Sequence, residues 1–556
     1  MTNICNFITG DGNAAPAFRR ALAALDKDRT ISFPEGEYHF YPEGCAQKYC
    51  YFSNNDEGIK TIAMLIENID GLTISGDNAR FIFHGRLSPL AAYHCRDLTV
   101  RGVSVDFEDS FVSDADLVKR ENGKAWFRIG GKYRFSDGKL HFTEDFYDNL
   151  HGKLHFRAME NGLVSFHTPA VTLDNRALEE QDGLVAFPDE FADFPVDTFV
   201  IKHELRLCPG MVFDHCRNLN LDRVIIHHAA GMGILAQQCD SVALDRVEVI
   251  PSFRRVAASD DAVHMTECRG TLRLANCNLT GTLDDSLNVH GVYHPMRLRE
   301  PGMRFFYLDS GHFQQMGLPG AEDGDTLELI KNDTHRPYGT IHVKRAEMLT
   351  KAITRIDFDE AELPAEFTPG DCVRVMEVAN ATLEVVNCKL KSANGRGVLA
   401  SGMKKVHIHG NDFRSFGSGI HIAGGANYWF ETGPVGEVVI ENNRFENCCV
   451  GSVHGATREP VIIFPELDIM PEDFFYHGSI TVRNNHFVSD RRTLVAMRSV
   501  TNATVTGNSV EFSTPGGVRV IPGKKGYFFT RGDDGRAAFW HCGKIVCDWE
   551  YSADYE

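Results

Sequence analysis

The 556-residue sequence contains no apolar run close to the ~18 residues that a membrane-spanning helix requires, so we predict no membrane span. Its first residues, Met1 to Phe7, lack the basic start and apolar core of a signal peptide. From the sequence as it stands we therefore expect a cytoplasmic protein. A secreted or periplasmic location is the alternative if a leader has been removed.

Basic residues are outnumbered by acidic ones, 57 against 76, which gives a net charge of −19. A surface of this sign repels phosphate backbones, so we expect no nucleic-acid partner. Hydrophobic residues make up 43% and charged residues 24% of the chain. These fractions are ordinary for a folded soluble chain and exclude disorder as the main state.

The 15 cysteines include no CxxC pairs with the spacing of a zinc site. Several of them end a short apolar segment, namely Cys216, Cys268, Cys277, Cys388 and Cys448. Small buried thiols stacked in a repetitive core explain this placement better than disulfides or metal ligands. We expect neither a cofactor nor a metal.

A short unit recurs along the chain at intervals of roughly 23 to 32 residues where nothing intervenes. Each unit has alternating apolar residues, then an Asn or Gly turn, then a second short apolar stretch, as in 218–226, 241–249, 437–445 and 479–487. Parallel β-helix coils have this pattern, whereas propeller blades need ~40–45 residues and hairpin turns. We predict an all-β fold, a right-handed parallel β-helix.

Two stretches interrupt the repeat, and each is long enough for a small β-barrel or sandwich domain. An amphipathic segment after Gly10 predicts a helix that covers the open end of the β-helix. We predict the following parts: 1–108 cap helix and first coils, 109–207 inserted β domain 1, 208–294 coils with an aspartate cluster, 295–376 inserted β domain 2, 377–514 C-terminal coils, and 515–556 a tail. A closing strand set and a partner contact are equally plausible for the tail.

Two consecutive coils carry matching polar segments, 258–268 and 282–291. A shift of one coil pairs Asp260 with Asp284 and Asp261 with Asp285. The same register pairs His264 with Asn288 and Thr266 with His290, and places Arg396 beside Asp285 and His421 in the same phase. Like charges this close raise at least one pKa, which suits general acid and base roles.

Alternative explanations exist for these residues. Paired aspartates also cap backbone N–H groups at corners or hold calcium, but two pairs in register beside His, Asn and Arg favour catalysis. We expect Asp261, Asp284 and Asp285 to be catalytic. The other residues expected to bind substrate on this face are Asp260, His264, Asn288, His290, Arg396 and His421.

The loop 424–433 carries Asn427, two adjacent rings at Tyr428 and Trp429, and the carboxylate Glu431. Rings on an exposed loop beside polar groups suit the apolar face of a sugar. Burial of both rings against the coil beneath is the alternative.

Several motifs together resemble glycoside hydrolase family 110. They are Ala230-Gly-Met-Gly-Ile-Leu-Ala-Gln, Asp261-Ala-Val-His, Cys268-Arg-Gly-Thr-Leu-Arg-Leu-Ala-Asn-Cys, Asp284-Asp-Ser-Leu-Asn-Val-His-Gly-Val-Tyr, Asn394-Gly-Arg-Gly-Val-Leu-Ala and Ala426-Asn-Tyr-Trp-Phe-Glu-Thr-Gly. The match runs in order from about residue 10 to 512, with two β-domain insertions in a β-helix.

This resemblance implies an exo-acting α-1,3-galactosidase that inverts configuration without a metal; some members cleave the blood group B determinant and others act on linear Galα1-3Gal. It places Asp261, Asp284 and Asp285 at or beside the reaction and Arg396, Trp429 and Glu431 around galactose. It also suggests a homodimer. The sequence departs from the family in lacking a visible secretion signal and in placing Asp260 beside Asp261.

Inversion requires one carboxylic acid to protonate the leaving oxygen and one carboxylate to activate water. We expect Asp285 or Asp261 to be the base and Asp284 to be the acid or a ligand of a sugar hydroxyl. The alternatives are a polygalacturonase-like β-helix hydrolase and a non-catalytic glycan-binding β-helix. The first is disfavoured because its Asn-Thr-Asp and Arg-Ile-Lys motifs are not visible and the chain is acidic.

Overall fold

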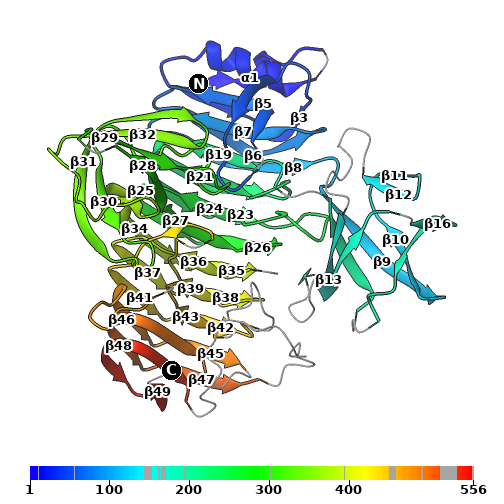
Figure 1. Ribbon diagram of the computed structural model, residues 1–556. Coiled ribbons are helices and arrows are strands. Elements are labelled where there is room, and N and C mark those ends of the chain that lie inside the picture. Colours follow the sequence, from blue (N-terminus) through cyan, green and yellow to red (C-terminus); the bar gives the residue numbers. More distant parts are fainter. Residues whose placement is uncertain are drawn as a thin grey trace.

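The computed structural model is a stack of β-helix coils that carries two inserted domains (Figure 1). It describes residues 1–553 except 11, 56, 143–152, 161–162, 165–170, 177, 193–195, 204–205, 301, 393–394, 427, 450–458, 468, 490–492 and 514–534. The chain is almost entirely β-structure, and the prediction of a parallel β-helix is confirmed.

Three parallel stacks of strands form the coils. The first, which we call the site stack, contains β5 (Gly58–Glu67), β7 (Ser88–Tyr93), β19 (Met211–Asp214), β21 (Ile234–Gln237), β24 (Val263–Thr266), β27 (Leu287–Val292), β36 (Val398–Ala400), β39 (Ile420–Ile422) and β43 (Val461–Ile463).

The second stack contains β2 (Thr30–Phe33), β6 (Thr73–Phe83), β8 (Thr99–Phe107), β20 (Arg217–Ile226), β22 (Asp240–Asp245), β25 (Arg269–Ala275), β34 (Thr382–Val386), β37 (Lys405–His409), β41 (Glu437–Glu441) and β44 (His477–Arg483).

The third stack contains β3 (Gly36–Phe40), the later parts of β6, β8 and β20, then β23 (Glu248–Val249), β26 (Asn278–Thr282), β35 (Lys389–Ser392), β38 (Asp412–Ser415), β42 (Arg444–Glu446), β45 (His486–Ser489) and β47 (Ser509–Phe512). The strands β46 (Val495–Thr506), β48 (Ala537–Cys547) and β49 (Tyr551–Ala553) continue the coils at the C-terminal end.

Alternation along each strand decides which side chains enter the core. In β37, Val406 and Ile408 are fully buried, while Lys405 and the two histidines face outward. Similar residues stack from coil to coil, as in the phenylalanine column of Phe413, Phe445 and Phe487, whose neighbouring rings lie 4.9 and 4.8 Å apart. A column of this kind fills the core without a cavity because each ring packs on the same ring one coil away.

Asparagines at one corner form a buried ladder. The side-chain amide of Asn443 donates to the backbone oxygen of Ile408 and to Asn485 Oδ1, while Asn443 Oδ1 accepts from the backbone and side chain of Asn411. Asn485 repeats the arrangement with Asn508. Each coil therefore satisfies the corner of its neighbour.

Helix α1 (Ala14–Ala23) covers the N-terminal end of the core, as the amphipathic segment predicts. Asn13 caps it by accepting a hydrogen bond from the backbone N–H of Ala15 at 3.0 Å. Phe18 and the alanines on its inner side are buried against the first coils. The apolar core is thereby closed to water at this end.

The first insertion forms a separate sheet with its own core, on one side of the stack in Figure 1. Its strands are β9 (Val112–Glu121), β10 (Lys124–Ile129), β13 (Lys153–Glu160), β14 (Leu163–Val164), β15 (Val171–Asp174), β16 (Glu179–Gln181), β17 (Leu184–Pro188) and β18 (Thr198–Lys202), with β11 (Tyr133–Ser136) and β12 (Lys139–Phe142) as a separate hairpin.

The second insertion is a closed barrel with its own core, on the opposite side of the stack in Figure 1. Its strands are β28 (His294–Arg299), β29 (Phe305–Asp309), β30 (Thr326–Ile330), β31 (Pro337–Thr350), β32 (Ile353–Phe358) and β33 (Cys372–Val375). The short helix α2 (Met376–Ala379) leads back into β34.

All 15 cysteines are free thiols, and the five that end apolar segments are buried. The expectation of stacked core thiols is therefore confirmed. None of the helices in the described part of the chain is long and apolar enough to cross a membrane.

Candidate active site

The two polar segments lie on neighbouring coils in the predicted register. Strands β24 and β27 pair in parallel, with His264 opposite Asn288 and Thr266 opposite His290. The aspartates stand just before these strands, at the corner where the chain enters the site stack. A cavity of about 130 Å³ opens there. Its lining residues are Asn54, Arg206, Asp261, Asp284, Asp285, Asn288, Arg396, Leu399, His421, Ala423, Trp429, Glu431 and Glu466.

Three carboxylates meet in this cavity. Asp261, Asp284 and Asp285 each present an oxygen, and these oxygens all lie within 4.8 Å of one another. Asp261 and Asp285 are almost fully buried, whereas the side chain of Asp284 is 20% exposed. Burial and the neighbouring carboxylates raise the pKa of Asp261 and of Asp285 well above the usual range, although nearby arginines oppose this.

Asp285 is held by Arg396, which follows β35 and precedes β36. The Arg396 guanidinium lies 3.0 Å from Asp285 Oδ2, and its backbone N–H donates to Asp285 Oδ1. The backbone N–H of Asp285 donates in turn to Asp261 Oδ1 at 3.0 Å. The two carboxylates are thus fixed relative to each other across the coil boundary.

A buried chain of hydrogen bonds runs behind Asp261. Its Oδ2 lies 2.8 Å from His264 Nδ1, His264 Nε2 lies 3.0 Å from His290 Nε2, and His290 Nδ1 lies 2.7 Å from the Gly291 carbonyl oxygen. Burial lowers the pKa of His264 to about 3 and that of His290 to about 4, so both rings are neutral near pH 7.

Only one proton arrangement satisfies this chain with neutral rings. The Gly291 carbonyl accepts from His290 Nδ1–H, so His290 Nε2 accepts from His264 Nε2–H. His264 Nδ1 then carries a lone pair and accepts from a protonated Asp261 carboxyl group. The two carboxylates titrate as a pair, so the raised pKa belongs to the one that holds the shared proton. The hydrogen-bond chain assigns that proton to Asp261, and the Arg396 guanidinium favours the ionised form of Asp285.

Arg206 links the two aspartates that remain. Its guanidinium lies 3.0 Å from Asp260 Oδ1 and 3.3 Å from Asp284 Oδ2, and it also donates to the backbone oxygen of Asn54. Lys202 Nζ donates to Asp260 at 2.8 Å. Although burial alone raises the pKa of Asp260, these two cations lower it overall, so this carboxylate is ionised.

Asp260, His264 and His290, which we expected to bind substrate, do not line the cavity. Asp260 is enclosed by Lys202 and Arg206, and the two histidines lie behind Asp261. These three side chains hold the cavity residues in place. Asn427 lies outside the described residues.

The opposite wall comes from the loop with the two rings. Glu431, in β40 (Glu431–Thr432), accepts from Asn288 at 3.2 Å and from Gln314 of the second insertion at 3.1 Å. Trp429 lines the cavity and packs edge-to-face on Phe313, with ring centroids 5.5 Å apart. Tyr428 is 60% exposed, so burial of both rings, the alternative we considered, does not describe this loop.

Buried polar atoms without partners gather at the cavity. Asn288 Oδ1, Arg396 Nε and both ring nitrogens of His421 have no hydrogen-bond partner among the described residues. Burial lowers the pKa of His421 to about 3, so its ring is neutral. Buried polar groups in native proteins normally have partners. The cavity therefore suits a ligand that brings several hydroxyl groups.

Arg206, Asn54 and Lys202 were missed by the sequence analysis. Arg206 and Lys202 come from the first insertion, where no repeat fixes the position of any residue, and Asn54 lies in an irregular segment before β5. The one signal for Arg206 and Lys202 is charge, because buried carboxylates require compensating cations.

Oxygens of the three carboxylates also lie close enough to hold a cation. Arg206 and Arg396 already place two guanidinium groups among them, so the positive charge that a cation would supply is present in the protein itself.

Comparisons with known proteins show similarity to alpha-1,3-galactosidases. Residues 308–373 match the family model of GLAA-B beta-barrel domain II. The chain is 29% identical over 527 residues to alpha-1,3-galactosidase B of Bacteroides thetaiotaomicron, covering 90% of this chain and 83% of that protein. It is 27% identical over 475 residues to alpha-1,3-galactosidase A of Bacteroides fragilis, covering 83% and 78%. Among solved structures, the Azotobacter vinelandii mannuronan C-5 epimerase AlgE6 A-module aligns with 10% identity over 93% of this chain and 100% of that chain, at a TM-score of 0.38, too low to support an inference.

The strand order shows a parallel β-helix, and the similarity to enzymes named alpha-1,3-galactosidases supports a glycoside hydrolase. More narrowly, they confirm the resemblance to glycoside hydrolase family 110 that the sequence motifs carry.

Proposed function

We propose that the protein removes terminal α-1,3-linked galactose from glycans, with inversion at the anomeric carbon. The observation that carries the proposal is the trio of carboxylates in one small cavity, in a chain whose relatives are named alpha-1,3-galactosidases. Trp429 offers an apolar surface to the sugar ring, and the partnerless polar atoms around it suit the sugar hydroxyls.

The three carboxylates have different roles in the proposed reaction. Asp284, the most exposed of the three, donates a proton to the departing glycosidic oxygen as the C1–O bond breaks. Asp285 accepts a proton from a water molecule whose oxygen bonds to C1 from the opposite face. Asp261 keeps its proton and orients the water together with Asp285. The products are β-galactose and the shortened glycan.

The carboxylate oxygens are closer than the ~6.5–9.5 Å that usually separates the groups of an inverting pair. Inversion at this spacing requires the acid and the base to lie on the same side of the reaction axis. This axis is the line from the attacking water through C1 to the leaving oxygen. The stereochemistry of the product therefore tests the mechanism directly.

An NMR time course of galactose release from Galα1-3Gal tests activity and stereochemistry together. We expect β-galactose to appear first and the α-anomer only after mutarotation. Initial α-galactose would keep the substrate but replace inversion by a covalent intermediate. Binding without release, or turnover of polygalacturonate instead, would overturn the proposed activity in favour of a binding module or another hydrolase.

Substitution of each carboxylate separates the roles. Asp284→Asn and Asp285→Asn are expected to lower kcat by at least ~10²-fold, the scale of a lost acid or base. Asn resembles a protonated aspartate, and its amide N–H can donate to His264 Nδ1, so Asp261→Asn is expected to retain more activity than Asp285→Asn. Near-normal turnover in all three variants would exclude this site. Asp222→Asn, on the outer face of β20, is the matched control and keeps full activity.

The homodimer suggested by the resemblance remains a prediction. Light scattering of the purified protein, which reports the mass of the particle in solution, tests it.

A further inference from the structure

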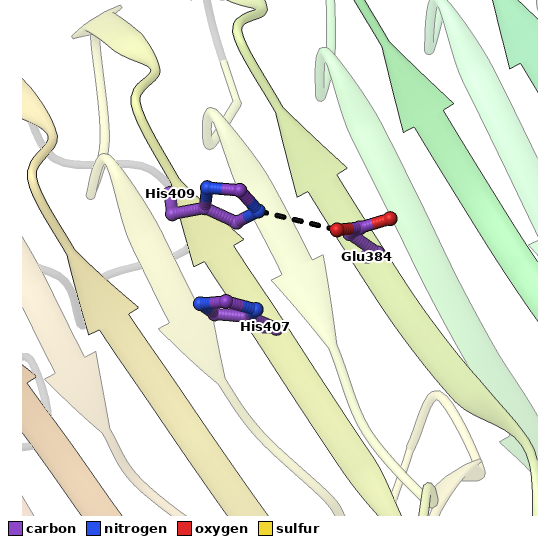
Figure 2. Close-up of side chains that lie close together, drawn as sticks. All are labelled: Glu384, His407 and His409. Carbon is purple, nitrogen blue, oxygen red and sulfur yellow. Dashed lines mark hydrogen bonds and ion pairs between the residues drawn. The ribbon is translucent and has the colours of Figure 1, made fainter.

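A second cluster of metal-ligating side chains lies on the outer face of the second stack, on a different sheet from the active site (Figure 2). His407 and His409 are two residues apart in β37, so both rings point away from the core, into which Val406 and Ile408 point. Glu384 stands on the neighbouring strand β34, opposite His407.

The side chains converge as Figure 2 shows. His409 Nε2 lies 3.2 Å from Glu384 Oε1, and the two imidazole rings stack with centroids 4.1 Å apart. One ligand atom from each of Glu384, His407 and His409 lies within 4.8 Å of the others. On the other side, His407 Nε2 lies 2.9 Å from Oε1 of Glu441 in β41.

Two arginines hold the carboxylates in place. Arg273 donates to Glu384 Oε2 at 2.7 Å, and Arg483 donates to Glu441 Oε2 at 2.7 Å. Each arginine thus occupies the outer oxygen and leaves Oε1 directed at the histidines. Groups behind the ligands that orient them in this way are a regular feature of metal sites.

We propose that Glu384, His407 and His409 bind a divalent transition-metal ion of the zinc class. Two imidazole nitrogens with carboxylate oxygens suit zinc, whereas calcium and magnesium prefer oxygen ligands alone. Ligand distances of ~2.0–2.2 Å are reached by rotation of the side chains, because the strands already lie side by side.

The ion would link β34 and β37, which belong to consecutive coils. Its effect is therefore on stability and not on the reaction in the cavity. The proposal departs from our sequence-based expectation of no metal. Glu384 and the His407–His409 pair are far apart in sequence, so only the coil register brings them together.

The test uses the full chain without a polyhistidine tag, freed of metal with EDTA and dialysed. Titration with ZnCl₂ by isothermal calorimetry is expected to show one tight site per chain, and zinc is expected to raise the thermal unfolding midpoint. His407→Ala, His409→Ala and Glu384→Gln are each expected to weaken this site by at least ~10–100-fold, to remove the zinc-dependent rise and to leave galactoside hydrolysis unchanged.

Two control variants make the result specific. His342 pairs with Glu360 at 2.8 Å on the barrel surface, where only one imidazole is present, so His342→Ala is expected to keep the tight site. Asp285→Asn disrupts the other cluster with metal-ligand spacing and is also expected to keep it. The proposal is overturned if the protein shows no tight zinc site, or if the site survives in the double variant His407→Ala/His409→Ala.

Discussion

Arg206 joins three parts of the site, because it contacts Asp260, Asp284 and the backbone of Asn54. Arg206 follows β18 in the first insertion and places a positive charge between Asp260, which lies outside the cavity lining, and Asp284, which lines the cavity. The position of Asp284 therefore depends on a residue of the first insertion and not only on its own coil.

Arg206→Ala is expected to lower kcat/KM by at least ~10²-fold, because Asp284 loses its orientation and Asp260 loses one of its two cations. Steady-state kinetics on a terminal α-1,3-galactoside measures the loss, and the unfolding midpoint shows whether the fold survives. Arg246→Ala removes an exposed arginine that pairs with Asp222 and is the matched control. Equal activity in both variants would contradict the role given to Arg206.

Glu267 is a buried acid at the corner after β24. Burial raises its pKa to about 7, although its hydrogen bond from the Val292 backbone N–H and the nearby Arg269 oppose this, and Asp325 and Glu322 add to it. In the unfolded chain a glutamic acid has its usual pKa near 4.5. Between these two values the folded state binds more protons than the unfolded state, so stability falls as pH rises.

The free energy of unfolding is expected to fall by about 3 kcal/mol between pH 4.5 and pH 7 and to level off above pH 7. Glu267→Gln cannot ionise and is expected to remove this part of the pH dependence. Thermal unfolding of both proteins at pH 5 and pH 8 measures it. If the variant loses as much stability between the two pH values as the parent, the titration does not belong to Glu267.

At the scale of elements, the asparagine ladder ties the C-terminal coils together. Asn443 is 2% exposed and both donates to and accepts from its neighbouring coils. Removal of its side chain takes a hydrogen-bond partner from the backbone N–H of Asn411, the backbone oxygen of Ile408 and the side chain of Asn485. The barrel and the active site are not involved.

Asn443→Ala is expected to destabilise the protein by ~1–3 kcal/mol or more, the cost of stranded buried polar groups. Asn508→Ala, at the partly buried last rung, is expected to cost less. Denaturant unfolding of the two variants gives the difference, with hydrolysis as the control for an intact site. A larger loss of stability at Asn508 than at Asn443 would contradict the assignment of the cost to buried polar groups.

Across the whole molecule, the features that could be predicted from the sequence are those that the coil repeat determines. The coil spacing determines which residues stack, so the contacts of Asp261 with Asp285 and of Asp285 with Arg396 were predictable from the register. The site depends equally on residues for which no register exists. Arg206 and Gln314 come from the insertions, and their side chains reach the site only because each insertion packs on the coils in one way.

The position of Asp260 shows the same limit. In the sequence it is indistinguishable from Asp261, and only the presence of Lys202 and Arg206 makes it a supporting group and not a cavity group. A coil repeat specifies where the backbone and the Cβ atom of each residue lie. The role of a carboxylate depends in addition on which cationic side chains contact it.

The barrel interrupts two coils that must pair, and this has a kinetic consequence. The ion pair between Arg273 of β25 and Glu384 of β34 joins residues 111 apart in sequence, and the entropy of closing such a loop grows with its length. The first and last barrel strands pair with each other, with His294 opposite Val373. Once the barrel has formed, its first and last strands lie side by side, so only a short loop remains to be closed between the two coils.

Productive folding is therefore expected to form the barrel before the coils on either side of it join. A defect in the barrel core, such as Phe306→Ala, is expected to delay the recovery of hydrolysis after dilution from denaturant, although Phe306 is buried in the barrel and not in the cavity. Folding of a domain inserted between two coils would then determine when the scaffold that carries it can assemble.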